Sequence, residues 1–124
     1  MAALDIELAA HPDAAPKARA RVRREFSDAV PAPLLYDLLT VISELVTNAS
    51  QHGDPGPVRV LIDLTRNGAV FGEVVNKGGG RPVPTDMDGE TLGLGLHIVD
   101  TISETWSAST DDGLTRVRFV LQPL

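Results

Sequence analysis

Glu44 and Asn48 have residue types and a spacing that can support chemistry. The apolar residues around them recur at steps of three and four, which predicts an amphipathic helix over 33–52. Residues four apart stack on one helix face, about one turn from each other. The Asn48 amide oxygen can ligate a hard cation such as Mg2+, and the Glu44 carboxylate can orient or deprotonate an attacking hydroxyl or water. The same pair also fits the ordinary polar side of a surface helix, and spacing alone does not separate the two interpretations.

A glycine pair downstream adds a possible phosphate site. Gly93 and Gly95 are predicted to precede a helix that continues to about residue 104. Glycine lets the backbone approach a phosphate closely, and a helix start offers free N–H groups and a positive dipole end. Gly-x-Gly before a helix also occurs as a plain tight turn. The stretch is neither a Walker A loop nor a dinucleotide fingerprint, because no Gly-Lys-Ser/Thr follows and the third glycine is missing.

Asn76 stands at the end of a strand predicted over 69–75, immediately before a run of glycines. A polar side chain followed by freely turning backbone is a suitable place to hold a ligand. An alternative is that Asn76 is only a turn residue. The segment 77–91 that follows is rich in glycine, proline and acidic residues and cannot pack a core of its own. We therefore predict that it is a lid or binding loop.

The other elements are predicted from periodicity and from turn residues. Alternation of apolar and polar residues predicts strands, and helical spacing predicts one further helix; these are the strands 4–8, 58–64, 105–110 and 115–121 and the helix 14–29. The charged face of the first strand fits a sheet edge. Asp13 is expected to cap the first helix, and Trp106 is expected to be a core anchor. This order of elements indicates an α+β two-layer sandwich, with a mostly antiparallel sheet and helices on one face.

Length and charge limit the function classes. A chain of 124 residues fits a single domain over 1–124, and a net charge of -6 disfavours direct nucleic-acid binding. The basic residues of 17–24 fit either a solvated helix face or a contact with an acidic partner. There is no cysteine, and neither a signal peptide nor a membrane-spanning run is recognisable, so we expect a soluble cytoplasmic protein.

Three segments together resemble the N box and the two glycine boxes of the Bergerat-fold (GHKL) ATPases, the superfamily of gyrase and the histidine-kinase catalytic domains. They are Glu44-Leu45-x-x-Asn48-Ala49-x-x-His52, Asn76-x-Gly78-x-Gly80 and Gly93-x-Gly95-Leu96-x-Ile98-Val99. The resemblance covers essentially the whole chain in the same order. Its closer branch is the small single-domain anti-sigma-factor serine kinases, RsbW-like. The resemblance implies an ATP-binding domain in which 77–91 is the ATP lid.

The resemblance also implies roles for individual residues. Glu44 would be the catalytic base and Asn48 the Mg2+ ligand, and the residues around ATP would be Asn48, Asn76, Gly78, Gly80, Gly93, Gly95 and Leu96. Where the family has an aspartate that accepts a bond from the adenine amino group, this chain has Asn76. A charged hydrogen bond contributes roughly 1.5–3 kcal/mol and a neutral one about 0.5–1.5 kcal/mol. The difference of about 1 kcal/mol would weaken ATP binding several-fold and leaves adenine specificity open.

No lysine or arginine occurs between Arg81 and Arg116, so phosphate neutralisation must rely on Mg2+, backbone N–H groups and Lys77 or Arg81. For activity, the resemblance implies transfer of the ATP γ-phosphate to a serine of an antagonist protein, with control of a sigma factor. It is also in keeping with a homodimer through the first strand and helix. One alternative is a regulatory module that binds nucleotide or a protein partner without catalysis. A fragment of a sensor histidine kinase ranks last, because the sequence shows no helix pair with a phosphoacceptor histidine.

Overall fold

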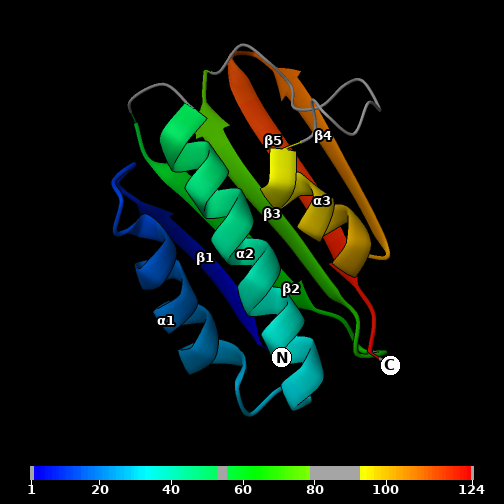
Figure 1. The fold of residues 1–124 in the computed structure, drawn as a ribbon. Coiled ribbons are helices and arrows are strands. Elements are labelled where there is room, and N and C mark those ends of the chain that lie inside the picture. Colours follow the sequence, from blue (N-terminus) through cyan, green and yellow to red (C-terminus); the bar gives the residue numbers. More distant parts are fainter. Residues whose placement is uncertain (1, 53–55, 79–92, 124) are drawn as a thin grey trace.

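The computed structural model describes residues 2–52, 56–78 and 93–123. In chain order the elements are β1 (Ala3–Leu8), α1 (Ala14–Phe26), α2 (Ala32–His52), β2 (Val58–Leu64), β3 (Val70–Lys77), α3 (Gly93–Ile102), β4 (Thr105–Asp111) and β5 (Leu114–Leu121). They form two layers, a sheet and a layer of helices (Figure 1). The α+β class predicted from the sequence is confirmed. Among the described helices, none is long and apolar enough to cross a membrane.

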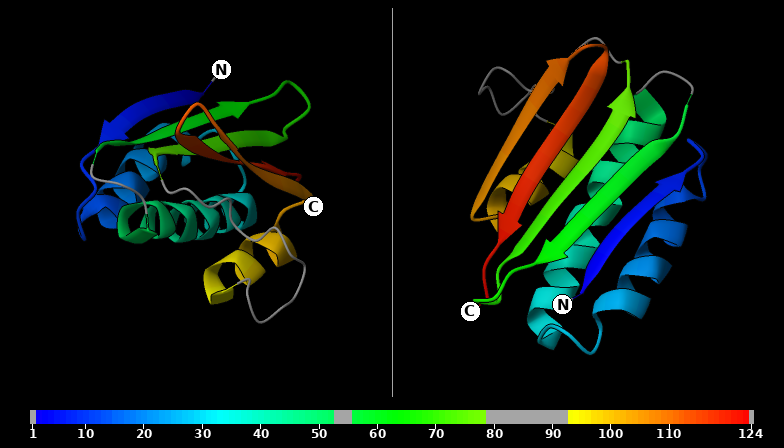
Figure 2. Two further views of the ribbon diagram at one scale, coloured as in Figure 1. Left: turned by 90° about the horizontal axis from the view of Figure 1, so that it is seen from above. Right: turned by 180° about the vertical axis from the view of Figure 1, so that it is seen from behind.

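The sheet has five strands in the order β1-β2-β3-β5-β4, and every neighbouring pair is antiparallel. β1 is an edge strand, as its charged face indicated. All three described helices cover the same face of the sheet, and α1 and α3 lie on opposite sides of α2 (Figures 1 and 2). The opposite face of the sheet carries no described helix.

The core lies between the sheet and the helices. The apolar stripes predicted for the first two helices are buried there, and the largest fully buried side chains are Phe26, Phe119, Leu38, Ile42, Ile62 and Leu121. In β2, Val58, Val60 and Ile62 point into the core while Arg59 and Asp63 are exposed. The alternation that predicted a strand at 58–64 is therefore the alternation between buried and exposed side chains of β2.

Three predictions about α1 and β3 were wrong. α1 ends at Phe26 rather than near residue 29, and Ala29 is exposed. Asp13 precedes α1 but makes no side-chain cap; its carboxylate pairs instead with His11 at 2.9 Å and Lys17 at 3.1 Å. β3 continues to Lys77 rather than stopping at residue 75, because its last residues remain paired with β5.

The presence of a glycine at position 72, in the middle of β3, is explained by the residue that faces it on β5. It lies directly opposite Phe119 of β5, on the face that packs against the helices. A β-carbon built on Gly72 would lie only 2.1 Å from Cζ of the Phe119 ring. Glycine normally weakens a strand interior, but here it makes room for a buried aromatic ring over the backbone. The pair fixes the register of β3 against β5.

We predict that Gly72→Ala lowers the free energy of unfolding by about 1–3 kcal/mol, because the added methyl group overpacks the Phe119 ring. Urea unfolding followed by circular dichroism measures this change. Phe119→Leu removes the ring edge that the methyl group meets. The double variant should therefore lose less stability than the two single losses added together. Simple additivity would contradict the proposed contact.

Candidate functional site

The Glu44–Asn48 pair lies on the flank of α2 that faces α3. Ser43, on the other flank, accepts a hydrogen bond of 2.8 Å from Arg19 of α1. One residue further along a helix is about 100° further round its axis, so Glu44 and Asn48 lie away from α1. α1 and α3 flank α2 on opposite sides (Figure 1). The helix geometry therefore directs the pair toward α3. Both side chains are half-buried.

Asn76 lies near the end of β3, on the helix-covered face of the sheet. It is directly opposite Thr115 of β5, and it shares the inward phase of Val74. Its amide nitrogen donates a hydrogen bond of 3.3 Å to the carbonyl of Lys77. That bond does not use the side-chain oxygen, which is the atom that the resemblance assigns to adenine. The placement of Asn76 on the inner face of a strand is therefore compatible with a ligand contact.

Thr115 is a polar residue of this region that the sequence analysis did not single out. Its side chain is only 5% exposed, and its hydroxyl donates a hydrogen bond of 2.9 Å to the carbonyl of Gly78. Gly78 has a φ of 73°, and its N–H donates to the carbonyl of Gly113 in the β4–β5 turn. Two bonds thus hold the backbone where β3 leaves the sheet. The available signal was a threonine at an inward position of an otherwise apolar alternation.

The first turn of α3 contains Gly93 and Gly95. The prediction that these glycines precede the helix was wrong, since the helix begins at Gly93. Free backbone N–H groups still belong to this first turn, so the physical argument for an anion there is unchanged. Leu96 is buried in the core, so a ligand contact there would have to use its backbone. Gly80 and most of the predicted lid lie outside the described residues.

Three elements that carry predicted site residues reach the same end of the molecule. α2 ends there, β3 leaves the sheet there, and α3 begins there (Figure 1). α2 packs against both α3 and β3. The fold therefore places the C-terminal half of α2, the end of β3 and the first turn of α3 toward one end of the molecule (Figure 1), although these segments come from distant parts of the chain.

The tail of α3 is fixed to the sheet by Trp106. The indole Nε1 of Trp106 in β4 donates a hydrogen bond of 2.7 Å to the Asp100 carboxylate of α3. Trp106 is half-buried against the core, which agrees with its predicted role as an anchor. The bond joins the far end of α3 to an edge strand, and so helps to set the direction of the first turn.

The described strands place their cationic side chains on the face of the sheet away from the site. Arg116 and Arg118 of β5 both bind Glu73, at 3.3 Å and 2.8 Å, on the face away from the helices. Lys77 has the same outward phase as Glu73 in β3. Of the candidate phosphate-neutralising cations, Arg81 lies outside the described residues. No group of three or more acidic, histidine or cysteine side chains that could hold a metal occurs within the described ranges. An Asn48 oxygen completed by phosphate and water oxygens remains a suitable donor set for Mg2+.

A comparison with known proteins gives the family of the chain. Residues 8–121 match the model of the histidine kinase-like ATPase domain. The chain belongs to this family. No curated protein matches it. The family's fold therefore applies to the chain, as the resemblance in its three boxes implied, and domains of this family generally bind ATP.

Two solved structures show the same fold. One holds the RsbU and RsbW domains of Rv1364c from Mycobacterium tuberculosis, with 22% identity and a TM-score of 0.79 over 98% of this chain. The other is the histidine kinase domain of a blue-light activated histidine kinase from Erythrobacter litoralis, with 19% identity and a TM-score of 0.58 over 86% of this chain. The chain spans 32% of the first structure's chain and 58% of the second's.

We predict that Thr115→Val lowers the free energy of unfolding by about 1 kcal/mol, because it leaves the Gly78 carbonyl without its hydroxyl donor. Thr110→Val is the matched control. Its hydroxyl lies 3.4 Å from that of Thr115, but its side chain is exposed, so a loss below about 0.5 kcal/mol is expected. Chemical denaturation of both variants measures the difference. Equal losses of unfolding free energy in the two variants would show that the Thr115–Gly78 hydrogen bond stabilises the fold no more than the exposed Thr110 hydroxyl does.

Proposed function

We propose that this chain binds Mg-ATP where α2, β3 and α3 meet and transfers the γ-phosphate to a serine of a small antagonist protein. The observation that carries the proposal is the convergence of Glu44, Asn48 and the first turn of α3 at one end of the fold. The family match supports ATP as the ligand. The RsbW domain in the matched mycobacterial structure supports the serine-kinase branch.

The proposed chemistry divides between two residues of α2. Glu44 accepts the proton of the substrate serine hydroxyl as the serine oxygen bonds to the γ-phosphorus and the bond to the β-phosphate oxygen breaks. ADP leaves with the electrons of that bond. The Asn48 side-chain oxygen holds Mg2+, which supplies neutralising charge to the phosphates. The N–H groups of the first turn of α3 bind phosphate oxygens.

Adenine recognition is proposed for Asn76, Gly78 and Gly80. The hydrogen bonds made by Gly78 give Asn76 a defined position at the end of β3. The Asn76 oxygen then accepts a bond from the adenine amino group without the charge that an aspartate would bring. Affinity several-fold below that of an aspartate-containing site follows from this difference.

A second candidate function is nucleotide or partner binding without transfer. The observation that favours it is the orientation of Arg116 and Arg118, which bind Glu73 on the far face of the sheet. Phosphoryl transfer normally uses a cation at the transferred group. Release of ADP and phosphorylation of a partner under saturating ATP separate this candidate from the kinase.

The proposed partners are the antagonist protein and a sigma factor, which this chain would hold when the antagonist is unavailable. Both partners would act in the cytoplasm. A chain that carries an RsbU domain beside the RsbW domain supports a regulatory partner of this kind. We also propose that the domain acts as a homodimer.

We predict that Asn48→Ala weakens Mg-dependent ATP binding at least tenfold, a loss of about 1.4 kcal/mol, since the metal loses a protein ligand. Glu44→Gln should bind ATP within about twofold of the natural chain and lose phosphotransfer. Thr47→Ala, about 100° round the axis of α2 from Asn48, is the control. Calorimetric titration with ATP, ADP and GTP in Mg2+ measures binding. Unchanged affinity in Asn48→Ala would remove the metal-ligand assignment.

We predict that Asn76→Asp tightens ATP binding several-fold, because a charged acceptor replaces a neutral one at the adenine amino group. Binding of GTP, which lacks that amino group, should not improve. The ratio of the two affinities measured by calorimetry is the readout. An equal gain for ATP and GTP would show that the carboxylate acts elsewhere than at the base.

A further inference from the structure

β4 is the edge strand on the α3 side of the sheet, and no described strand pairs with its outer side (Figure 1). It pairs with β5 in one continuous register, from Thr105 opposite Val120 to Asp111 opposite Leu114. An edge strand offers a row of unpaired N–H and C=O groups to any extended chain that comes close. β4 is therefore long and regular enough to accept another strand.

The turn that joins β4 to β5 determines which backbone groups of β4 face outward. Asp112 and Gly113 form a two-residue connection, with φ of 53° and 76°. Positive φ at both central residues is typical of a type I′ hairpin turn, whose flanking residues are joined by a hydrogen bond. The flanking pair here is Asp111 and Leu114. Hydrogen-bonded and non-hydrogen-bonded pairs then alternate along the antiparallel ladder.

Alternation from this turn directs the backbone groups of Trp106, Ala108 and Thr110 away from β5. The pair of Thr110 with Thr115 supports this phase, because their hydroxyl oxygens are 3.4 Å apart and side chains lie closer in non-hydrogen-bonded pairs. The three outward residues each offer one N–H donor and one C=O acceptor at the edge. A strand bound there can form a regular ladder with them.

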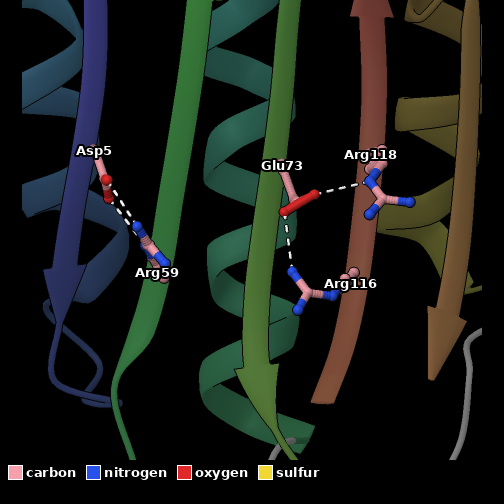
Figure 3. Close-up of polar contacts among 5 residues, drawn as sticks. All are labelled: Asp5, Arg59, Glu73, Arg116 and Arg118. Carbon is pink, nitrogen blue, oxygen red and sulfur yellow. Dashed lines mark hydrogen bonds and ion pairs between the residues drawn. The ribbon is translucent and has the colours of Figure 1, made fainter. Parts of the chain in front are cut away.

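The usual protection of an edge strand is present on β1 and missing from β4. Proteins protect such edges with charges, proline or bulges. On β1, Asp5 accepts two hydrogen bonds from Arg59, of 3.0 Å and 2.8 Å, and Glu7 is also exposed (Figure 3). On β4, the residues 105–110 include neither a charged residue nor a proline. The two edges of the sheet therefore differ in how readily they accept another strand.

The helix side of β4 has an apolar surface that is only partly covered. Trp106 and Ala108 pack against the core from this side but remain partly exposed. The indole of Trp106 is held in place by its hydrogen bond to Asp100 of α3. A further strand beside β4 would place every second side chain next to these two residues. Apolar side chains at those positions would be buried against them.

The surroundings of β4 are acidic. Four exposed carboxylates lie on β4 or on the segments beside it, namely Asp100, Glu104, Asp111 and Asp112. The segment 93–111 contains no lysine or arginine. The arginines of the neighbouring β5, Arg116 and Arg118, bind Glu73 of β3 instead (Figure 3). Charge complementarity therefore favours a basic strand at this edge.

The same charges disfavour a second copy of this chain at the edge of β4. Two β4 strands related by a two-fold axis would run antiparallel, so the Asp111 end of each strand would lie beside the Glu104 end of the other. Like charges that face each other across two strands are destabilising. A basic segment of a different protein meets no such repulsion.

We propose that the open edge of β4 binds an extended basic segment of a partner protein by strand addition. In this mode main-chain hydrogen bonds give affinity, and alternate side chains give specificity. The bound segment runs antiparallel to β4, which is the more stable arrangement. It carries apolar side chains toward the helix layer and lysine or arginine at the alternate positions. The proposal does not depend on ATP binding, because β4 contributes no residue to the Glu44–Asn48 flank or to the first turn of α3.

Amide hydrogen exchange followed by NMR tests the edge in the natural chain. The amides of Trp106, Ala108 and Thr110 should exchange quickly, and those of Ser107 and Ser109 slowly, because only the latter two bond β5. A peptide as long as β4, in which valine alternates with lysine, should slow exchange of the three outward amides at least tenfold. Equally slow exchange of all five amides in the free chain would overturn the proposal.

A pair of methylated peptides tests the strand pairing, with fluorescence anisotropy of a label as the measure of affinity. Methyl groups on the backbone nitrogens of the valines remove the donors that face β4 in an antiparallel pair, so affinity should fall about 30-fold or more. Methyl groups on the backbone nitrogens of the lysines face away and should change affinity less than about threefold. A loss confined to the lysine-methylated peptide would support the edge and reverse the direction of the bound strand.

Equal affinities of the two methylated peptides would overturn the proposal. So would the absence of saturable binding of the unmethylated peptide below about 1 mM. A peptide with glutamate in place of lysine should bind at least tenfold more weakly, because the edge is acidic. Equal binding of the basic and acidic peptides would contradict a basic partner.

Two matched alanine-to-proline variants locate the binding edge. Ala108→Pro removes one outward N–H and should weaken binding of the valine–lysine peptide at least tenfold. Proline is tolerated in an edge strand where its nitrogen faces solvent. Ala3→Pro, at the first residue of β1 on the opposite edge, is the control and should leave the affinity unchanged. Circular dichroism checks that both variants fold. Unchanged affinity in a folded Ala108→Pro chain would exclude the edge of β4.

Discussion

The two-residue period of β3 is the constraint on which the rest of the structure depends. Each side chain of this central strand must point to one of two faces, and the two faces have different surroundings. The inward set, Gly72, Val74 and Asn76, leads from the core to the candidate site. The outward set contains Phe71 and Glu73. A shift of one residue would exchange these sets, and the Gly72–Phe119 contact opposes such a shift.

α2 also directs its side chains toward different neighbours, with the period of a helix instead of that of a strand. Its core stripe anchors the helix on the sheet, its Ser43 flank bonds α1, and its Glu44–Asn48 flank faces α3. Burial of the core stripe fixes the rotation of the helix about its axis. The direction in which the two candidate functional side chains point is therefore a consequence of apolar packing. Catalysis in the proposed kinase would thus depend on residues that never touch ATP.

Features that are signalled by neighbouring residues in the sequence could be predicted, and features that depend on distant partners could not. Alternation and helical spacing predicted the strands and helices, and proline and glycine predicted most of their ends. The Asp13 cap was wrong because Lys17 and His11 compete for its carboxylate. The start of α3 was wrong because glycine is compatible with both a turn and a first helical turn. Thr115 was missed because its importance lies in a partner 37 residues away.

The set of residues that gathers on the face of the sheet away from the helices could also not be predicted from the sequence. Phe71, Leu61 and Val120 belong to three different strands, and only the strand order β2-β3-β5 brings them together. The same is true of Glu73, whose two arginine partners come from a strand more than 40 positions later. Such juxtapositions depend on the sheet topology, which short-range patterns do not specify.

The bond between Trp106 and Asp100 has a consequence for spectroscopy. The chain contains one tryptophan, so its entire indole emission comes from the junction of α3 and β4. A nearby carboxylate and partial burial both influence the wavelength and yield of that emission. The natural chain thus contains a built-in optical probe at the far end of the helix whose first turn faces the candidate site, and a movement of α3 can be followed without a label.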